Sequence, residues 1–319
     1  MNGKPEITVI GNAAIDILAS PVSTEVFEKG TLPVNEIKMS FGGDAQNEAV
    51  LLSRFGKRVE LFSKLGKDEA GMRILDRVRE NGVSVDKIVP DPTMPSPINV
   101  VLIEENGERN FLTNPKSSMR KLTDEDVLPI LDTAGDIVSF ASLFVSTSMD
   151  IPQAARIFKA VKSKPGRILT VDVTKAKFGE TIEDLKVLLP YVDYIFPNEE
   201  EAAVLTGVKD ARENARLLVE AGAGCAVVKV GSKGCIIHTK EKTIEVSAYP
   251  VSKCIDTTGA GDSFAAGFIY GLSEKMPLED CGKFACAVAS CTVECVGATD
   301  GVLSIDKPME RFLEMKAEK

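Results

Sequence analysis

Short runs of β-branched and aromatic residues alternate along the chain with segments whose apolar residues recur every three or four positions. The runs predict strands at Ile7–Ile10, Val59–Ser63, Val100–Ile103, Ile137–Phe140, Ile168–Val173, Tyr194–Phe196, Cys225–Val230 and Gly234–His238. The periodic segments predict helices at Asn47–Phe55, Ala70–Asn81, Asp124–Leu131, Pro152–Lys162, Ile182–Leu189, Glu199–Thr206, Asp210–Ala221, Asp262–Ser273 and Leu278–Cys295. Strands that alternate with helices are typical of crossover connections. We therefore expect an α/β fold with a mostly parallel central sheet and helices on both faces.

Two segments, residues 13–40 and 96–115, break this alternation because they lack helical periodicity. They carry alternating apolar residues, and the Asn106-Gly107 pair between Val100–Ile103 and Arg109–Leu112 predicts a β-hairpin. We interpret both segments as a small antiparallel β lid inserted into a single domain that spans residues 1–319. Such a lid would cover the strand ends, where open α/β sheets bind their ligands.

The composition narrows the functional classes. The chain has 319 residues, of which 44% are apolar and 27% charged, as in an ordinary soluble domain. A net charge of −9 argues against a nucleic-acid partner, because such partners need a basic surface. No apolar run approaches the roughly 18 residues that a membrane span requires. The chain starts without an apolar signal segment, so we expect a cytoplasmic protein.

The cysteines and the histidine argue against further kinds of chemistry. All seven cysteines lie in the last third of the chain, and Cys281, Cys286, Cys291 and Cys295 lack the Cys-x-x-Cys spacing of metal sites. We interpret these four as small core residues with reduced thiols. His238 is the only histidine, so the usual parts of a Ser-His-Asp triad or a histidine-rich metal site are missing.

The most informative segment is Gly259-Ala260-Gly261-Asp262, in which three small residues precede an apolar helical pattern. A helix that begins there offers unpaired backbone N–H groups and the positive end of its dipole, which together attract an anion. Asp262 could take a proton from a hydroxyl while these amides stabilise a transferring phosphoryl group. The same pattern also fits an ordinary loop with an acidic helix cap.

A second glycine turn, Gly42-Gly43, runs into a helix that carries Asn47. Together with the segment Asp256–Asp262, it resembles the two signatures of the ribokinase (PfkB) family of sugar and nucleoside kinases. The resemblance covers nearly the whole chain, including Gly11-Asn12 and the segments 64–71, 106–109, 197–202, 229–234 and 296–298. It implies a ribokinase-like three-layer sandwich, and an enzyme that uses ATP and Mg²⁺.

The resemblance also assigns roles on the nucleotide side. Asp262 matches the catalytic base, and the amides of Gly259–Gly261 match the anion hole for the γ-phosphate. Asn198 and Glu201 match an element that organises Mg²⁺ and the ATP phosphates, although an Asn before three glutamates also suits a helix cap. The other positions matched to the nucleotide are Lys229, Gly231, Ser232, Gly234 and Cys286.

A further match concerns a monovalent cation, K⁺ in those family members that use one. The resemblance assigns this cation to a loop that contains Asp256, Thr258, Thr292, Cys295 and Gly297.

On the acceptor side, the resemblance assigns the sugar hydroxyls to Asn12, Asp16, Gly42, Gly43, Asp44 and Asn47. Carboxylate and amide side chains suit vicinal hydroxyls because they form paired hydrogen bonds with them. Asp44 stands where ribose-specific members often carry a lysine. This reversal of charge disfavours an acidic acceptor unless Arg109 or Arg120 compensates for it.

These features predict a kinase that phosphorylates a primary hydroxyl of a neutral sugar of the ribose or fructose class. Three alternatives stay open. One is a nucleoside kinase with an apolar floor of Met39, Phe41, Ile98 and Phe111; another is a kinase for a sugar acid or phosphosugar; the third is a non-catalytic sugar or nucleotide sensor. An exposed apolar lid face would favour a homodimer formed lid to lid.

Overall fold

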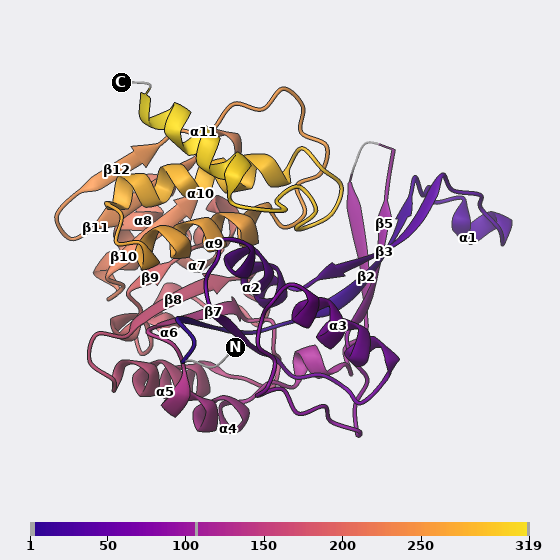
Figure 1. Cartoon of the computed structure of the whole chain (residues 1–319), viewed down its shortest axis with the longest axis horizontal. Coiled ribbons are helices and arrows are strands. Elements are labelled where there is room, and N and C mark those ends of the chain that lie inside the picture. The colour runs from indigo at the N-terminus through magenta and orange to yellow at the C-terminus, as the bar shows by residue number, and fades with distance from the viewer. Residues whose placement is uncertain (1–3, 106–107, 318–319) are drawn as a thin grey trace.

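The structure is a computed structural model that describes residues 4–105 and 108–317. An eight-stranded sheet lies at its centre (Figure 1). Its strands are β1 (Ile7–Ile10), β4 (Val59–Phe62), β7 (Ile137–Leu143), β8 (Ile168–Val173), β9 (Tyr194–Ile195), β10 (Cys225–Lys229), β11 (Cys235–Thr239) and β12 (Thr243–Val246). Their order is β12-β11-β10-β9-β8-β7-β1-β4, and the neighbours from β10 to β4 are all parallel. The predicted mostly parallel sheet is confirmed.

Helices cover both faces of this sheet. One face carries α2 (Asp44–Arg54), α3 (Glu69–Glu80), α9 (Ala260–Ser273), α10 (Leu278–Thr292) and α11 (Asp306–Ala317). The other carries α5 (Ile151–Lys162), α7 (Glu199–Thr206) and α8 (Ala211–Glu220), with two shorter helices. Adjacent residues of β7 serve different layers, since Ile137 joins one core and Val138 the other. The predicted three-layer sandwich is therefore confirmed.

The segments 124–131 and 182–189, each predicted as one helix, contain only short α-helices. The observed elements are α4 (Asp124–Val127) with the 3₁₀ helix Leu128–Thr133, and α6 (Ile182–Leu185) with the 3₁₀ helix Leu189–Tyr191. Each of these 3₁₀ helices contains a proline, Pro129 or Pro190. A proline ring clashes with the preceding α-helical turn, and this clash explains why the α-helices are short. No helix in the described ranges is long and apolar enough to cross a membrane.

A second sheet projects from the body (Figure 1); it is built from the two segments predicted to form a lid and is called the lid below. It contains β2 (Ala14–Ser20), β3 (Glu36–Gly42), β5 (Ile98–Ile103) and β6 (Arg109–Thr113) in the order β3-β2-β5-β6, and α1 (Val26–Lys29) connects β2 to β3. The expectation of a fully antiparallel lid is wrong, because β2 and β5 pair in parallel. Each hairpin leaves the body through its first strand, so these two strands run in the same direction. The predicted turn at Asn106-Gly107 lies outside the described residues.

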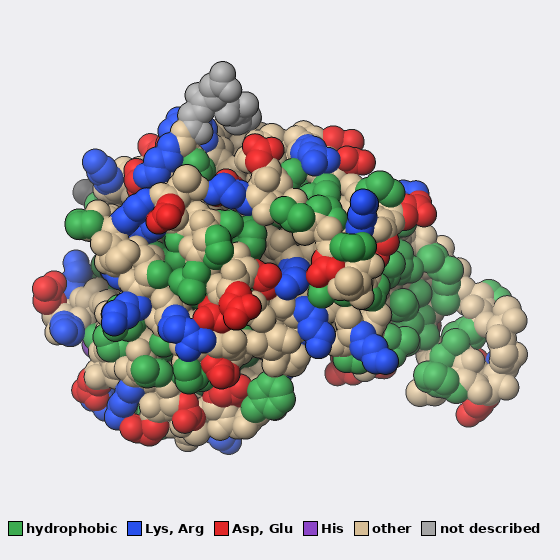
Figure 2. Space-filling model, turned by 90° about the horizontal axis from the view of Figure 1, so that it is seen from below, with side chains coloured by type: hydrophobic (Ala, Val, Ile, Leu, Met, Phe, Trp, Pro, Cys, Tyr) green, Lys and Arg blue, Asp and Glu red, His purple; other side chains and the backbone are tan. Residues whose placement is uncertain are grey.

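One face of the lid exposes apolar side chains. Ile37, Met39, Ile98 and Leu112 are 72%, 46%, 45% and 57% exposed, respectively. The strand register places all four on the same face. Figure 2 shows hydrophobic side chains gathered where the projecting lid meets the body. Such a face is compatible with the predicted lid-to-lid homodimer, which stays a prediction.

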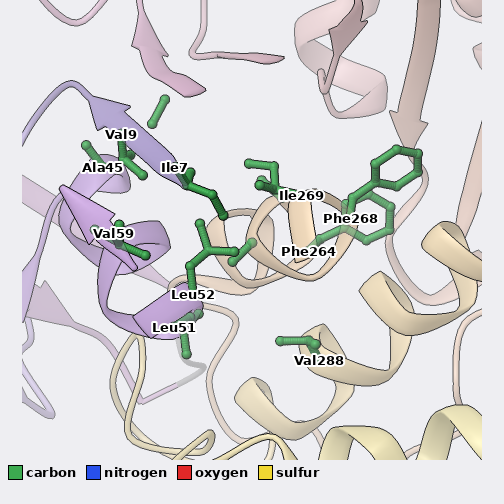
Figure 3. Packing of buried hydrophobic residues seen from close by; sticks show 14 of the residues in the cluster. Ile7, Val9, Ala45, Leu51, Leu52, Val59, Phe264, Phe268, Ile269 and Val288 are labelled. Carbon is green, nitrogen blue, oxygen red and sulfur yellow. The ribbon is translucent and has the colours of Figure 1, made fainter. Parts of the chain in front are cut away.

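Packing between α2 and α9 brings the two glycine turns together. Leu51 and Leu52 of α2 lie in the same core as Phe264 and Ile269 of α9 (Figure 3). The apolar residues of β1, including Ile7, complete this part of the core. The first turns of both helices are thereby held at the same edge of the sheet.

Candidate active site

The polar residues of the two glycine turns meet where the parallel strands end. A cleft at this edge is lined by residues that follow β1, β4 and β7, among them Asn12, Lys64 and Val145. Ser142, near the end of β7, also lines it. Open α/β sheets bind ligands at this edge. Of the site residues predicted from the sequence, Asn12 lines this cleft, and the site at the strand ends stays a prediction.

Asp262 lies in the first turn of α9, behind a glycine cap. Gly259 has φ 71° and ψ 4°, and a Cβ there would lie 2.5 Å from the Ala298 carbonyl oxygen, so a side chain does not fit. Asp262 Oδ2 accepts a hydrogen bond of 2.7 Å from Asn47 Nδ2 of α2. Burial raises the pKa of the Asp262 carboxyl, although Asn47 and Lys229 favour its charged form. A carboxylate with a raised pKa is a better proton acceptor near neutral pH.

Lys229 adds a positive charge beside the predicted anion hole. Its Nζ lies 3.4 Å from the position that a Cβ on Gly261 would take. It also donates hydrogen bonds of 3.0 and 2.9 Å to the two carboxylate oxygens of Asp172, and the side chains are 13% and 7% exposed. Burial raises the pKa of Asp172 to about 7, even though Lys229 opposes the shift. The sequence analysis did not select Asp172; an acid inside the apolar strand Ile168–Val173 is the signal that could identify it.

Asn198 and Glu201 form the helix cap that the sequence offered as an alternative. Asn198 Oδ1 accepts from the Glu201 N–H, and Glu201 Oε2 accepts from the Asn198 N–H, both at 2.8 Å. These two bonds make the capping box of α7. Burial raises the pKa of Glu201, and the nearby Lys229 opposes that shift. The cap therefore holds one carboxylate close to the lysine of the anion site.

The acceptor-side residues converge where β2 leaves the body. Gly43 has φ 95°, and a Cβ there would lie 2.6 Å from the Asn12 carbonyl oxygen. A Cβ on Gly42 would lie 2.2 Å from Asp16 Oδ2, so these two residues share one face of the lid. Asp16 is 9% exposed, and its Oδ1 accepts a hydrogen bond of 2.8 Å from Asn99 Nδ2. Asn99 has no distinctive sequence signal, because its role depends on the β2–β5 register.

Asp44 is a second acid on the acceptor side. Its Oδ2 accepts a hydrogen bond of 3.1 Å from Ser142 Oγ. Burial, followed by repulsion from Asp262 and Asp172, raises the pKa of Asp44 well above its ordinary value. Burial likewise raises the pKa of Asp16. The acceptor side is thus rich in buried carboxylates.

The loop predicted to hold a monovalent cation is held together by Asp256. Its Oδ1 accepts a hydrogen bond of 2.7 Å from the Thr258 N–H, and its Oδ2 accepts one of 2.9 Å from the Gly297 N–H. The same carboxylate forms an ion pair with Arg109 of the lid, whose charge also acts on the carboxyl group of Asp16. Burial alone would raise the pKa of Asp256, but these partners hold it below its ordinary value. Because Asp256 already has a cationic partner, the residues present do not fit a K⁺ site.

The remaining matched residues lie on the nucleotide side or in the core. The segment Gly231–Gly234 forms the turn of the β10–β11 hairpin, and Ser232 is exposed in it. Cys286 of α10 is 5% exposed and belongs to the core. Thr292 is fully buried, and its carbonyl accepts the N–H of Cys295 at 3.1 Å. The roles assigned to these residues stay predictions.

Comparison with known proteins decides the family. Residues 4–305 match the family described as pfkB family carbohydrate kinase. The chain belongs to this family. An uncharacterized sugar kinase of Archaeoglobus fulgidus is 32% identical over 259 residues, which cover 79% of this chain and 97% of that protein. A cytidine kinase of Thermococcus kodakarensis is 28% identical over 86% of this chain and 91% of its own length.

A solved structure gives the same result. The structure of Arabidopsis thaliana ribokinase complexed with ribose and ATP is 25% identical and has a TM-score of 0.80, covering 97% of this chain and 99% of that one. As a pfkB-family carbohydrate kinase, the protein is a phosphotransferase with an alcohol group as acceptor, and kinases of this fold use ATP, typically with Mg²⁺. Its relatives include both ribokinases and nucleoside kinases, so the family does not select the acceptor.

Proposed function

We propose that this pfkB-family kinase transfers the γ-phosphoryl group of ATP to a primary hydroxyl of a neutral sugar of the ribose or fructose class. The position of Asp262 carries the proposal. Its carboxylate accepts a hydrogen bond from Asn47 on the predicted acceptor side. The residue before it in the chain is Gly261, and a Cβ on this glycine would point toward the Lys229 ammonium group. A base in this position lies between an acceptor hydroxyl and the terminal phosphate.

Unpaired buried oxygens favour an acceptor that is rich in hydroxyl groups. Within the described ranges, Asn12 Oδ1 and Asn99 Oδ1 are buried without a hydrogen-bond partner. Leaving such a group unsatisfied costs about 1–3 kcal/mol, so a ligand that donates to it gains affinity. Asp16, next to Asn99, also accepts hydrogen bonds. A neutral sugar supplies several donors here and adds no charge to the acidic acceptor side.

The lid register places most of the residues expected to form an apolar floor for a nucleoside base on the other face of the lid. Asp16 pairs with Asn99 and shares its face of the lid, whereas the neighbouring Ile15 lies on the opposite face. Three of the residues expected to form the floor share the face of Ile15: Met39, Phe41 and Ile98. The expectation is wrong for these three, and only Phe111 lies on the acceptor face.

The residues of this chain account for each part of the proposed reaction. The acceptor oxygen attacks the γ-phosphorus, the bond to the β,γ-bridging oxygen breaks, and Asp262 accepts the hydroxyl proton. The backbone N–H groups of Gly259 and Gly261, together with Lys229, stabilise the negative charge on the transferring group, whereas the Ala260 N–H already donates to the Thr257 carbonyl at 3.2 Å. Glu201 would hold Mg²⁺ with the carboxylate oxygen that the cap leaves over, and Mg²⁺ would supply positive charge to the phosphates when bound. The lid excludes water from the site.

An acceptor screen tests this proposal. ADP release is measured in a coupled assay with ATP, Mg²⁺ and, in turn, ribose, fructose, adenosine and a sugar acid. We expect ADP release that depends on ribose or fructose, together with a product that is heavier by one phosphoryl group. Release with adenosine alone would replace the neutral sugar by a nucleoside. Absence of acceptor-dependent release with every neutral sugar would refute the proposal.

One observation favours a sugar acid or phosphosugar as the second candidate acceptor. Arg120 is half-buried beside the cleft. Its Nη1 donates a hydrogen bond of 2.9 Å to the carbonyl of Val145, a residue that lines the cleft. Burial, and then repulsion by Arg120, lowers the pKa of Lys177, so the two cations lie near each other. They could bind a carboxylate or phosphate at the far end of an acceptor. In that case, Arg120→Met should raise KM for the acidic acceptor at least about tenfold.

A further inference from the structure

A lid residue reaches across to the loop in front of the anion site. Arg109 is the first residue of β6, and Asp256 lies three residues before the Gly259 cap of α9. Arg109 Nη2 forms an ion pair with Asp256 Oδ1, and the two side chains are only 16% and 2% exposed. Both charges lose most of their water, so the pair is favourable only if each partner is well placed.

Asp256 in turn fixes the backbone below the phosphate-binding turn. Its two carboxylate oxygens accept from Thr258, which directly precedes the glycine cap, and from Gly297, which follows α10. The carboxylate therefore joins two segments of the loop. Without a positive partner, this buried negative charge would oppose the binding of ATP phosphates at the adjacent turn. Asp256 thus needs a cation.

We propose that Arg109 is this cation: a positioning residue whose guanidinium group neutralises Asp256, so that phosphoryl transfer by this enzyme needs no monovalent metal ion. K⁺ at the same loop would have to share the carboxylate with the guanidinium, and the two positive charges would repel each other. Because Arg109 belongs to the lid, the positive charge reaches Asp256 with the lid in the position observed here.

A second ion pair between lid and body provides a matched control. Lys38 Nζ of β3 lies 3.3 Å from Asp300 Oδ2, and the two side chains are 38% and 41% exposed. Solvent screens this pair, so its loss has little effect on the charges around it. Lys38→Met therefore removes a contact between lid and body without leaving a buried carboxylate below the anion site.

Initial rates in different salts test the proposal. The wild type and Lys38→Met are assayed with ATP, Mg²⁺ and a working acceptor in KCl, NaCl or choline chloride at equal ionic strength. We expect their rates to agree within about twofold across the salts, whereas Arg109→Met should be at least about tenfold slower in choline chloride and recover in KCl. Arg109→Lys keeps the charge and should stay insensitive to the salt.

A thermal melt supplies a readout that does not depend on turnover. KCl should raise the melting temperature of Arg109→Met relative to choline chloride, because the ion then binds at Asp256, and it should not raise that of the wild type. A wild type that is activated about tenfold or more by K⁺ would overturn the proposal, as would an Arg109→Met variant whose rate and melting temperature ignore K⁺. If no acceptor is phosphorylated, the proposed function fails, and the melts still decide the role of Arg109.

Discussion

Replacing Asp262 with asparagine removes a charge from the site and leaves its shape intact. Asparagine has the same heavy-atom geometry as aspartate. Its amide oxygen can still accept the hydrogen bond that Asn47 Nδ2 donates to Asp262 at 2.7 Å. The Gly259 cap and the start of α9 depend on the backbone and stay unchanged. The variant therefore isolates the proton-accepting role from binding.

The magnitude of the effect follows from that role. A general base contributes about 10²–10⁴-fold to the rate, or about 3–5 kcal/mol of the barrier. ATP affinity should change little, because in the proposed site Lys229 and backbone amides, rather than Asp262, bind the phosphates. The folded state should not lose stability either, since Asp262 contributes to the raised pKa values of Asp44 and Asp16 through repulsion, which the neutral amide removes.

Three measurements separate the possible outcomes. Steady-state ADP release gives kcat and KM, calorimetric titration gives the ATP affinity, and a thermal melt reports folding. The control is Asp76→Asn on α3, which makes the same chemical change at a side chain that is 69% exposed. Turnover of Asp262→Asn within about tenfold of the wild type would refute the role of this carboxylate as base. A loss of ATP affinity that matches the loss of kcat would assign it to nucleotide binding instead.

Three further predictions concern stability and assembly. Burial raises the pKa of Asp172 from 3.8 to about 7, so its contribution to stability is present below the lower value and is lost as the pH rises through about 7. Denaturation at several pH values should show a smaller loss in Asp172→Asn than in the wild type, by at most about 4 kcal/mol, because other buried carboxyls with raised pKa values remain in the variant. Gly259→Ala should lower the free energy of unfolding by more than the roughly 1–3 kcal/mol that a strained backbone costs, because the added Cβ meets Ala298. The control is Gly56→Ala, where φ is 85° and no atom lies close to the added Cβ, so only the backbone strain should appear. Ile37→Lys on the exposed lid face should turn a dimer into a monomer in sedimentation, and a monomeric wild type would contradict the homodimer.

Local signals in the sequence predict most of the fold and the glycine turns. Continuous apolar runs and helical patterns give the strands and helices of the body, because the central strands are buried on both faces and the helices on one. Gly43 and Gly259 are visible because a positive φ and a close backbone approach demand glycine. The helix cap at Asn198 and Glu201 is local as well, since both residues belong to one helical turn. All these features depend on neighbours within a few positions.

The remaining features depend on contacts between distant segments. Asp172 and Lys229 meet because two strands separated by a short third strand end at the same edge of the sheet. Asn99 reaches Asp16 only in the parallel β2–β5 register, which the hairpin signal does not specify. Arg109 gave no hint of its partner, because an arginine in a hairpin suits solvent, an acceptor or a buried acid equally well. Sequence patterns identify such residues but do not pair them.

The distribution of charge supports the proposal that Asp262 lies between two substrates. On the predicted acceptor side, burial raises the pKa values of Asp16 and Asp44, so their carboxyl groups suit hydrogen bonds with hydroxyl groups and offer no positive charge to a phosphate. On the other side of Asp262, Lys229 and the N-terminus of α9 attract phosphates. The two ligands are therefore directed to opposite sides of one carboxylate, and each satisfies charges or oxygens that are costly to leave buried without a partner. In the proposed reaction, this placement of charge would align an acceptor hydroxyl with a γ-phosphate on either side of Asp262.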